Sequence, residues 1–127
     1  MKSLPPCFTA YDVRGKIPDN FDEHIARHIA LAFADHYEIQ KIVVGRDMRL
    51  SSPLLARTVV TGLLDQGVDV IDLGLCGTEE VYHAVFSQAA DGVGGGIMIT
   101  ASHNPAEYNG MKFVQREARP VSADSGL

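Results

Sequence analysis

Apolar residues recur every three or four positions over residues 21–37, the spacing of one face of an α-helix. The stretch therefore predicts an amphipathic helix. Asn20 stands just before it and Glu23 lies three residues further on. This pair is typical of a capping box, so we expect the helix to be capped by Asn20.

Two further helices are indicated by their start signals. At Ser52-Pro53 the hydroxyl favours an N-cap and the proline suits the first helical position, and Gly67 predicts the end of that helix. At residues 77–80 the acidic side chains favour the positive first turn of another helix, which continues to Val85.

Short apolar or alternating runs between these helices predict strands. We expect a turn at Asn109-Gly110, a dipeptide typical of hairpins. The expected strands cover residues 8–13, 41–45, 68–73, 97–100 and 111–114.

Strands that alternate with helices predict an α/β fold, here a mixed, largely parallel sheet sandwiched between helices. Ligand sites in such folds form beyond the carboxyl ends of strands. We therefore expect functional residues in the loops after strands 41–45 and 97–100.

Composition sets limits on function without assigning one. The 127 residues suit one domain, with 46% hydrophobic and 21% charged residues. The formal net charge of −5 argues against nucleic acid or an anionic membrane as partner. No apolar run approaches the roughly 20 residues that span a bilayer, and no signal peptide is evident, so we expect a cytoplasmic protein.

Two pairs of residues have ordinary structural interpretations. Cys7 and Cys76 do not form a CxxC pattern, and we expect reduced thiols, although the sequence leaves a bridge between them open. His24 and His28 have a spacing that can hold a metal on a helix. Without an HExxH pattern we expect them to lie on an exposed helix face.

Several common motifs are absent. The sequence has no GxxxxGK[ST] phosphate loop and no GxSxG nucleophile elbow. The glycine cluster at residues 92–96 does not fit GxGxxG, and a strand-like run follows it instead of a helix. A mononucleotide or dinucleotide fingerprint is therefore not supported.

Ser102 is the most suggestive single residue. It follows a predicted strand and stands in TASHNP, a segment of small and turn-forming residues. A serine that only caps its neighbours is the ordinary interpretation of such a position. Cations follow other predicted strands or the expected turn, and arginine suits phosphate. The cations are Arg14, Arg46, Arg49 and Lys112. The residues alone predict an anion site around a serine, without a reaction.

Five motifs occur in order along essentially the whole chain. They are residues 10–15 (AYDVRG), 45–49 (GRDMR, followed by SS at 51–52), 77–78 (GT), 100–105 (TASHNP) and 108–112 (YNGMK). Through these motifs the sequence resembles the α-D-phosphohexomutases, the family of phosphomannomutases and phosphoglucomutases. The TEE variant at 78–80 and the tail at 118–122 look most like bacterial phosphomannomutases that supply GDP-mannose.

The resemblance implies an isomerase that moves phosphoryl groups within a hexose. Ser102 would carry a phosphoryl group, pass it to a hexose 6- or 1-phosphate, and take the other phosphoryl back from the bisphosphorylated sugar. Mannose 6-phosphate and mannose 1-phosphate would thus interconvert. Arg14 and Lys112 would neutralise charge and assist proton transfer, and His103 would orient the phosphoserine or carry a proton. Thr100, Ala101, Asn104 and Pro105 would form the phosphate loop, with Arg46 and Asp47 supporting it.

The same resemblance implies that parts of the enzyme lie elsewhere. Family members bind Mg²⁺ between the phosphoserine and a DGDxDR-like motif on a second domain. This sequence contains no such motif, so Ser102, through its phosphate, would be its metal ligand. Residues 1–127 would be the phosphoserine-loop domain, inactive alone, and its partners would be hexose phosphates, of mannose or glucose, and the missing domains.

Two alternatives belong to other classes. A free-standing domain could bind phosphosugars without catalysis. A serine hydrolase could use Ser102 and His103, but adjacent residues rarely face each other and no acid partner or oxyanion motif is evident. We also expect an isolated domain of this kind to expose apolar faces and to self-associate weakly.

Overall fold

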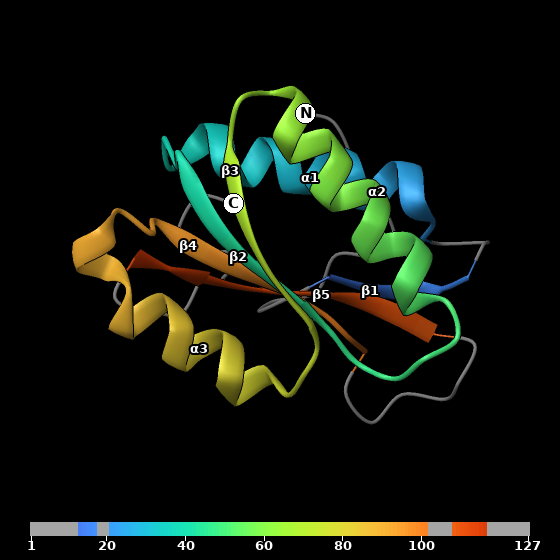
Figure 1. The fold of residues 1–127 in the computed structure, drawn as a ribbon. Helices are drawn as coiled ribbons and strands as arrows, with labels where there is room; N and C mark the ends of the chain where they lie inside the picture. Colours follow the sequence, from blue (N-terminus) through green and yellow to red (C-terminus); the bar gives the residue numbers. More distant parts are fainter. Residues whose placement is uncertain (1–12, 18–20, 102–107, 117–127) are drawn as a thin grey trace.

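A five-stranded sheet with helices on both faces organises the protein (Figure 1). The structure is a computed structural model, and it describes residues 13–17, 21–101 and 108–116. The elements in chain order are β1 (Val13–Lys16), α1 (Glu23–His36), β2 (Lys41–Arg46), α2 (Ser52–Asp65), β3 (Asp69–Leu75), α3 (Thr78–Ser87), the 3₁₀ turn η1 (Ala89–Asp91), β4 (Gly95–Ile99) and β5 (Tyr108–Gln115).

The strand order in the sheet is β1-β5-β4-β2-β3. β2 runs parallel to both of its neighbours, β3 and β4. β5 pairs antiparallel with β4, and β1 pairs antiparallel with β5. The predicted mixed α/β sheet is confirmed, with parallel pairs β2-β3 and β2-β4 and antiparallel pairs β4-β5 and β1-β5.

The helices form two layers that enclose the sheet (Figure 1). α1 and α2 lie together on one face and contribute to the larger core, which includes Phe33, Leu63 and Ile97. α3 lies on the other face over a smaller core around Val43, Val85 and Val114. The predicted sandwich is therefore present, and side chains of alternating direction along each strand supply both cores.

The start of α1 differs from the prediction. Asp22, in an extended conformation, is the N-cap, and its carboxylate accepts a hydrogen bond from the backbone N–H of Ile25 at 2.9 Å. The expected cap, Asn20, was therefore wrong. Asp22 fulfils the same physical requirement, because a short oxygen-bearing side chain satisfies an N–H that the helix leaves unpaired.

The two ends of α2 differ in how well the sequence predicted them. Ser51 occupies the N-cap position, and the Ser52 hydroxyl donates to Asp47 Oδ1 at 2.6 Å, so the expected Ser52 cap was wrong. The predicted end is confirmed. Gly67 has a φ of +83°, and Gly67 and Val68 donate to the last turn of the helix, the pattern of a Schellman motif.

The expected turn at Asn109-Gly110 was also wrong, since both residues lie inside β5. Their places in the strand follow from burial: the Asn109 side chain is fully buried and hydrogen-bonded, and Gly110 lies where β1 comes closest. The first expected strand, 8–13, overlaps the described β1 only at Val13, and its other residues lie outside the described part of the chain.

The glycine cluster packs the sheet against its neighbours. A Cβ added at Gly96 would lie 2.7 Å from Val85 Cγ2, and one at Gly95 would lie 2.9 Å from Ile39 Cδ1. Both distances are shorter than van der Waals contact, so only glycine lets α3 and the α1–β2 connection approach β4. The cluster thus has a packing role at the amino end of β4, opposite the predicted site.

His24 and His28 are exposed on α1, as expected from the sequence. Within the ranges that the structure describes, no helix has both the length and the apolar character to cross a membrane.

Candidate functional site

The carboxyl ends of the parallel strands meet at one edge of the sheet, and the loop after β2 is attached to the end of β4. The backbone N–H of Asp47 donates to the carbonyl of Ile99 at 3.1 Å. The next residue, Thr100, donates its own N–H to the carbonyl of Gly110 in β5 at 2.9 Å. The loop after β2 therefore lies beside the end of β4, where the second loop predicted to be functional begins.

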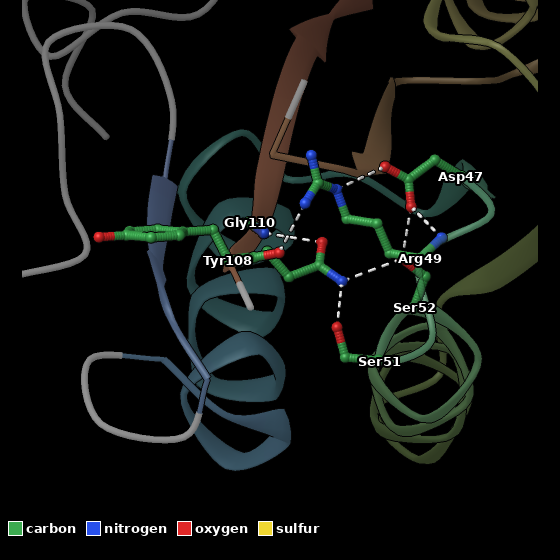
Figure 2. Close-up of polar contacts among 7 residues, drawn as sticks. Asp47, Arg49, Ser51, Ser52, Tyr108 and Gly110 are labelled. Atoms are coloured by element: carbon green, nitrogen blue, oxygen red, sulfur yellow. Dashed lines mark hydrogen bonds and ion pairs between the residues drawn. The ribbon is translucent and has the colours of Figure 1, made fainter. Parts of the chain in front are cut away.

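Asp47 is the centre of a hydrogen-bonded network at this edge (Figure 2). Its Oδ1 accepts from the Ser52 hydroxyl at 2.6 Å and from the backbone N–H of Arg49 at 3.1 Å. Its Oδ2 accepts from Arg49 Nε at 3.3 Å. Arg49 Nη1 donates in turn to the carbonyl of Tyr108, also at 3.1 Å, and so connects the loop to the first residue of β5.

Asn109 completes the network from the β5 side. Its Nδ2 donates to Ser51 Oγ at 2.7 Å and to Ser52 Oγ at 2.9 Å, and its Oδ1 accepts from the N–H of Gly110 at 2.8 Å. Asn109 and Ser52 are fully buried. Both amide hydrogens and the amide oxygen are satisfied, as burial requires.

The association of Asn109 with Ser51 and Ser52 was not predicted from the sequence. Ser52 was expected to cap a helix and Asn109 to lie in a turn, the usual positions of these residue types. A signal was available, because extending the apolar alternation of residues 111–114 backwards places Asn109 on the buried face of a strand. The expected supporting role of Asp47 is consistent with its contacts.

Arg14, Gly110 and Thr100 lie in one row across three strands. Arg14 of β1 pairs with Gly110, and Gly110 accepts the hydrogen bond from Thr100 just past β4. Lys112 lies two residues further along β5, opposite Met98. Alternation puts Arg14 and Lys112 on the sheet face that α3 covers further along, since Met98 and Val114 belong to the core beneath α3.

Both predicted cations are half-buried. Among the residues that the structure describes, the Lys112 ammonium has neither a hydrogen bond nor an ion pair. Two cationic side chains thus share one face of the sheet beside the end of β4, in a protein whose net charge is negative. Such an arrangement attracts an anion.

Other predicted site residues divide between the described and undescribed parts of the chain. Thr100 is 5% exposed and Ala101 is buried, so both phosphate-loop residues that the structure describes are packed against the end of the sheet. The remaining four follow directly and lie outside the described residues: Ser102, His103, Asn104 and Pro105.

Arg49 is one of the cations that the sequence predicts near an anion site. Its side chain is only 12% exposed and forms an ion pair with Asp47 at 3.3 Å. With a second bond to the Tyr108 carbonyl, the guanidinium is used within the protein. Arg49 therefore supports the loop, and Arg14 and Lys112 are the predicted cations that share a sheet face beside the end of β4.

Cys76 is a free thiol just after β3. Burial raises the pKa of the Cys76 thiol above its ordinary value, and the carboxylates of Glu80 and Asp72 add to the rise. The thiol form therefore dominates at neutral pH, which argues against a nucleophilic role for Cys76. Cys7 lies outside the described residues.

No group of three or more His, Cys, Asp or Glu side chains within residues 13–17, 21–101 and 108–116 could hold a metal ion. Mg²⁺ prefers six oxygen ligands in octahedral geometry. The described residues alone therefore do not form a magnesium site.

Comparison with protein families identifies the domain. Residues 6–125 match the model described as phosphoglucomutase/phosphomannomutase, alpha/beta/alpha domain I. The phosphohexose mutase of Xanthomonas campestris strain B100 is 50% identical over 122 residues, 96% of this chain and 27% of that protein. The phosphomannomutase of Escherichia coli K12 is 50% identical over 127 residues, 100% of this chain and 27% of that protein.

A solved structure gives the same result. The phosphoglucomutase/phosphomannomutase family protein of Burkholderia thailandensis superposes with a TM-score of 0.83 at 39% identity, over 93% of this chain and 27% of that one. The chain thus spans about a quarter of the length of each of these relatives. By sequence and by fold, it belongs to the phosphoglucomutase/phosphomannomutase family and carries the family's α/β/α domain I.

Proposed function

We propose that this chain is the catalytic-serine domain of a phosphomannomutase, with Ser102 as the carrier of the phosphoryl group. The observation that supports this most directly is the position of Arg14 and Lys112 on one sheet face, beside the point where β4 leads into residue 102. A phosphoserine carries about −1.5 to −2 charge near neutral pH, so it needs nearby cations in a protein of net charge −5.

Phosphoryl transfer depends on positioning and charge neutralisation more than on covalent chemistry by the protein. In the proposed step a hydroxyl oxygen of a hexose phosphate attacks the phosphorus, and the bond from phosphorus to Ser102 Oγ breaks. The hydroxyl proton moves to Ser102 Oγ, directly or through His103. The product is a bisphosphorylated hexose, which returns its other phosphoryl group to Ser102 by the reverse reaction.

The remaining residues have roles that follow from their chemistry. Arg14 offers a planar set of donors to phosphate oxygens, and Lys112 offers a compact positive charge that can also take part in proton transfer. A histidine side chain can gain or lose a proton near neutral pH, so the residue type at position 103 suits proton transfer or orientation of the phosphoserine. Asn104 and Pro105 would shape the loop, and the small side chain of Ala101 leaves room for substrate oxygens.

The proposed function also involves a magnesium ion and domains beyond this chain. When bound, Mg²⁺ would neutralise phosphate charge, and the Ser102 phosphate would be the ligand from this chain. The described residues supply no group of three or more metal ligands of their own. We further propose that complete mutase turnover requires domains beyond this chain, as the relatives' greater length suggests, whereas phosphoryl uptake by Ser102 proceeds in this chain alone.

The test is phosphoryl uptake. The purified chain is incubated with mannose 1,6-bisphosphate and Mg²⁺, and the modified residue is located by tandem mass spectrometry. We expect one phosphate on Ser102, and none on a Ser102→Ala variant. Ser87→Ala, which removes an exposed serine from α3, is the matched control and should take up phosphate like the unmodified chain.

The outcomes separate the proposed functions. Phosphate on Ser102 supports the catalytic-serine domain. Tight binding of the bisphosphorylated sugar without transfer would favour the phosphosugar-binding module instead. Labelling of Ser102 by a fluorophosphonate would favour a serine hydrolase and contradict the proposal.

A further inference from the structure

We propose that Asp47, Arg49, Ser52 and Asn109 form a positioning frame that fixes both ends of segment 102–107. The proposal rests on the proposed function, because its purpose is to hold Ser102 relative to Arg14 and Lys112. None of the four residues is placed in contact with the substrate. They act through the backbone, and all four lie in the described part of the chain.

One loop is attached to both ends of the segment. On the incoming side, the Asp47 N–H bonds to the carbonyl of Ile99, two residues before Ala101. On the outgoing side, Arg49 bonds to the carbonyl of Tyr108, the first described residue after the segment. The frame therefore sets where the segment begins and where it ends.

The choice of arginine at position 49 follows from this geometry (Figure 2). Nε donates to Asp47 while Nη1 donates to the Tyr108 carbonyl, so a single planar group joins the loop to β5. A lysine would keep the positive charge but could not make both bonds with the same rigid spacing. Arg49→Lys is therefore the most informative substitution.

Burial makes the frame stiff. Ser52 and Asn109 are fully buried, and Arg49 is 12% exposed. The Ser52 hydroxyl donates a hydrogen bond to Asp47 and accepts one from Asn109, so both its donor and its acceptor are used. Breaking one member leaves another buried polar group without its partner, which costs more than the bond itself contributes.

The frame also bears on the two cations. Asn109 precedes Gly110, whose row contains Arg14 and Thr100, and it is three residues from Lys112. The hydrogen bonds from Asn109 to Ser51 and Ser52 fix the position of β5 relative to the start of α2. The loop after β2 thus holds the strand that carries Lys112 as well as both ends of the serine segment.

The first arm of the test measures structure without catalysis. Amide hydrogen exchange is followed by NMR in the unmodified chain, in Arg49→Lys and in Ser52→Ala. We expect the amides of Thr100 and Gly110 to exchange about ten-fold faster in both variants. Amides within α1 should keep their rates. Arg57→Lys, an arginine exposed on α2, is the matched control and should change neither set.

The second arm measures the saturation of phosphoryl uptake from mannose 1,6-bisphosphate. In Arg49→Lys we expect the maximal rate to fall roughly ten- to hundred-fold, because misplacement by about 1 Å has effects of this size. The half-saturating sugar concentration should stay within about two-fold, because Arg14 and Lys112 are unchanged. A smaller fraction of folded protein would also lower the maximal rate. The folded fraction of each variant is therefore measured by a circular-dichroism melt.

Each outcome of the two measurements supports or contradicts the positioning frame or the proposed function. Unchanged exchange at Thr100 and Gly110 in both variants overturns the frame. So does faster exchange with an unchanged maximal rate, because the contacts would then be structural only. If the unmodified chain takes up no phosphate, the proposed function fails, and unchanged or faster exchange still decides whether the frame holds the segment ends.

Discussion

Individual polar side chains determine most of what the site can do. Ser52 and Asn109 look in sequence like a cap and a turn, yet both are fully buried and bonded to each other. Tertiary contacts override the local preference, because a buried hydroxyl and a buried amide are stabilised more by their mutual hydrogen bond than by the helix ends and turns where these residues usually lie. Local rules therefore failed at the positions where the loop after β2 meets β5.

The Cys76 thiol gives a pH-dependent prediction at the same scale. Burial and the Glu80 carboxylate raise its pKa, so the reactive thiolate is scarcer at neutral pH than in an unfolded chain. In a Cys7→Ser background, we expect alkylation by iodoacetamide to rise with pH to a midpoint above that of the chain unfolded in urea. Glu80→Gln should lower this midpoint, since it removes one charge. A folded-state midpoint at or below the unfolded one would contradict the assignment.

Helices and strands were largely predictable from the pattern of apolar residues. All three helices, and the strands β2 to β4, occur where the periodicity placed them, with ends shifted by a few residues. Asp22 replaced Asn20 as a cap because both are suitable and only the folded helix decides between them. The antiparallel pairing of β5 with β1 was not predictable, because it depends on Gly110 allowing the two backbones to approach.

A prediction about the pairing of β1 with β5 concerns Gly110. A Cβ at this position would collide with the carbonyl oxygen of Val13 and would lie 2.9 Å from the Cα of Arg14. We expect Gly110→Ala to lower the free energy of unfolding by about 3 kcal/mol, measured by urea denaturation. Amides of β1 should lose their protection from hydrogen exchange.

The matched control for that prediction is Gly74→Ala. Gly74 has a φ of +67° and open space around its Cα, so alanine there costs only backbone strain, about 1 kcal/mol. If Gly110→Ala is no less stable than Gly74→Ala, the close approach of β1 to β5 is not what requires glycine.

At the scale of the whole molecule, apolar side chains are exposed at the same edge as the candidate site. Leu50 is 100% exposed, Met48 83% and Leu75 62%, all at the carboxyl ends of β2 and β3 or just beyond them. Clustered exposed apolar residues are typical of surfaces that pack against something else. The chain spans about a quarter of the length of the Xanthomonas campestris and Escherichia coli K12 relatives.

We therefore predict that the isolated chain self-associates weakly. Sedimentation velocity should show an apparent mass that rises with concentration, and Leu50→Ser should reduce that rise because it removes the most exposed apolar side chain. Arg57→Lys again serves as the control. A single monomer at every concentration tested would contradict the prediction.

The candidate site was predictable only in part, because the strand order of the whole sheet brings its residues together. The sequence indicated Arg14 and Lys112 through their motifs, and the strand order brings them together from β1 and β5. The supporting frame could not be predicted, because Asp47 and Asn109 are far apart in sequence and meet only once β4 lies between β2 and β5.

The central claim is that a phosphate on Ser102 lies against Arg14 and Lys112. The most direct measurement is the second pKa of that phosphoserine, from ³¹P NMR of the phosphorylated chain across pH. Nearby cations favour the doubly charged phosphate, so we predict a pKa below the ordinary value of about 6, rising toward it in Arg14→Met and in Lys112→Met. A phosphoserine pKa at its ordinary value, unchanged in both variants, would contradict the account.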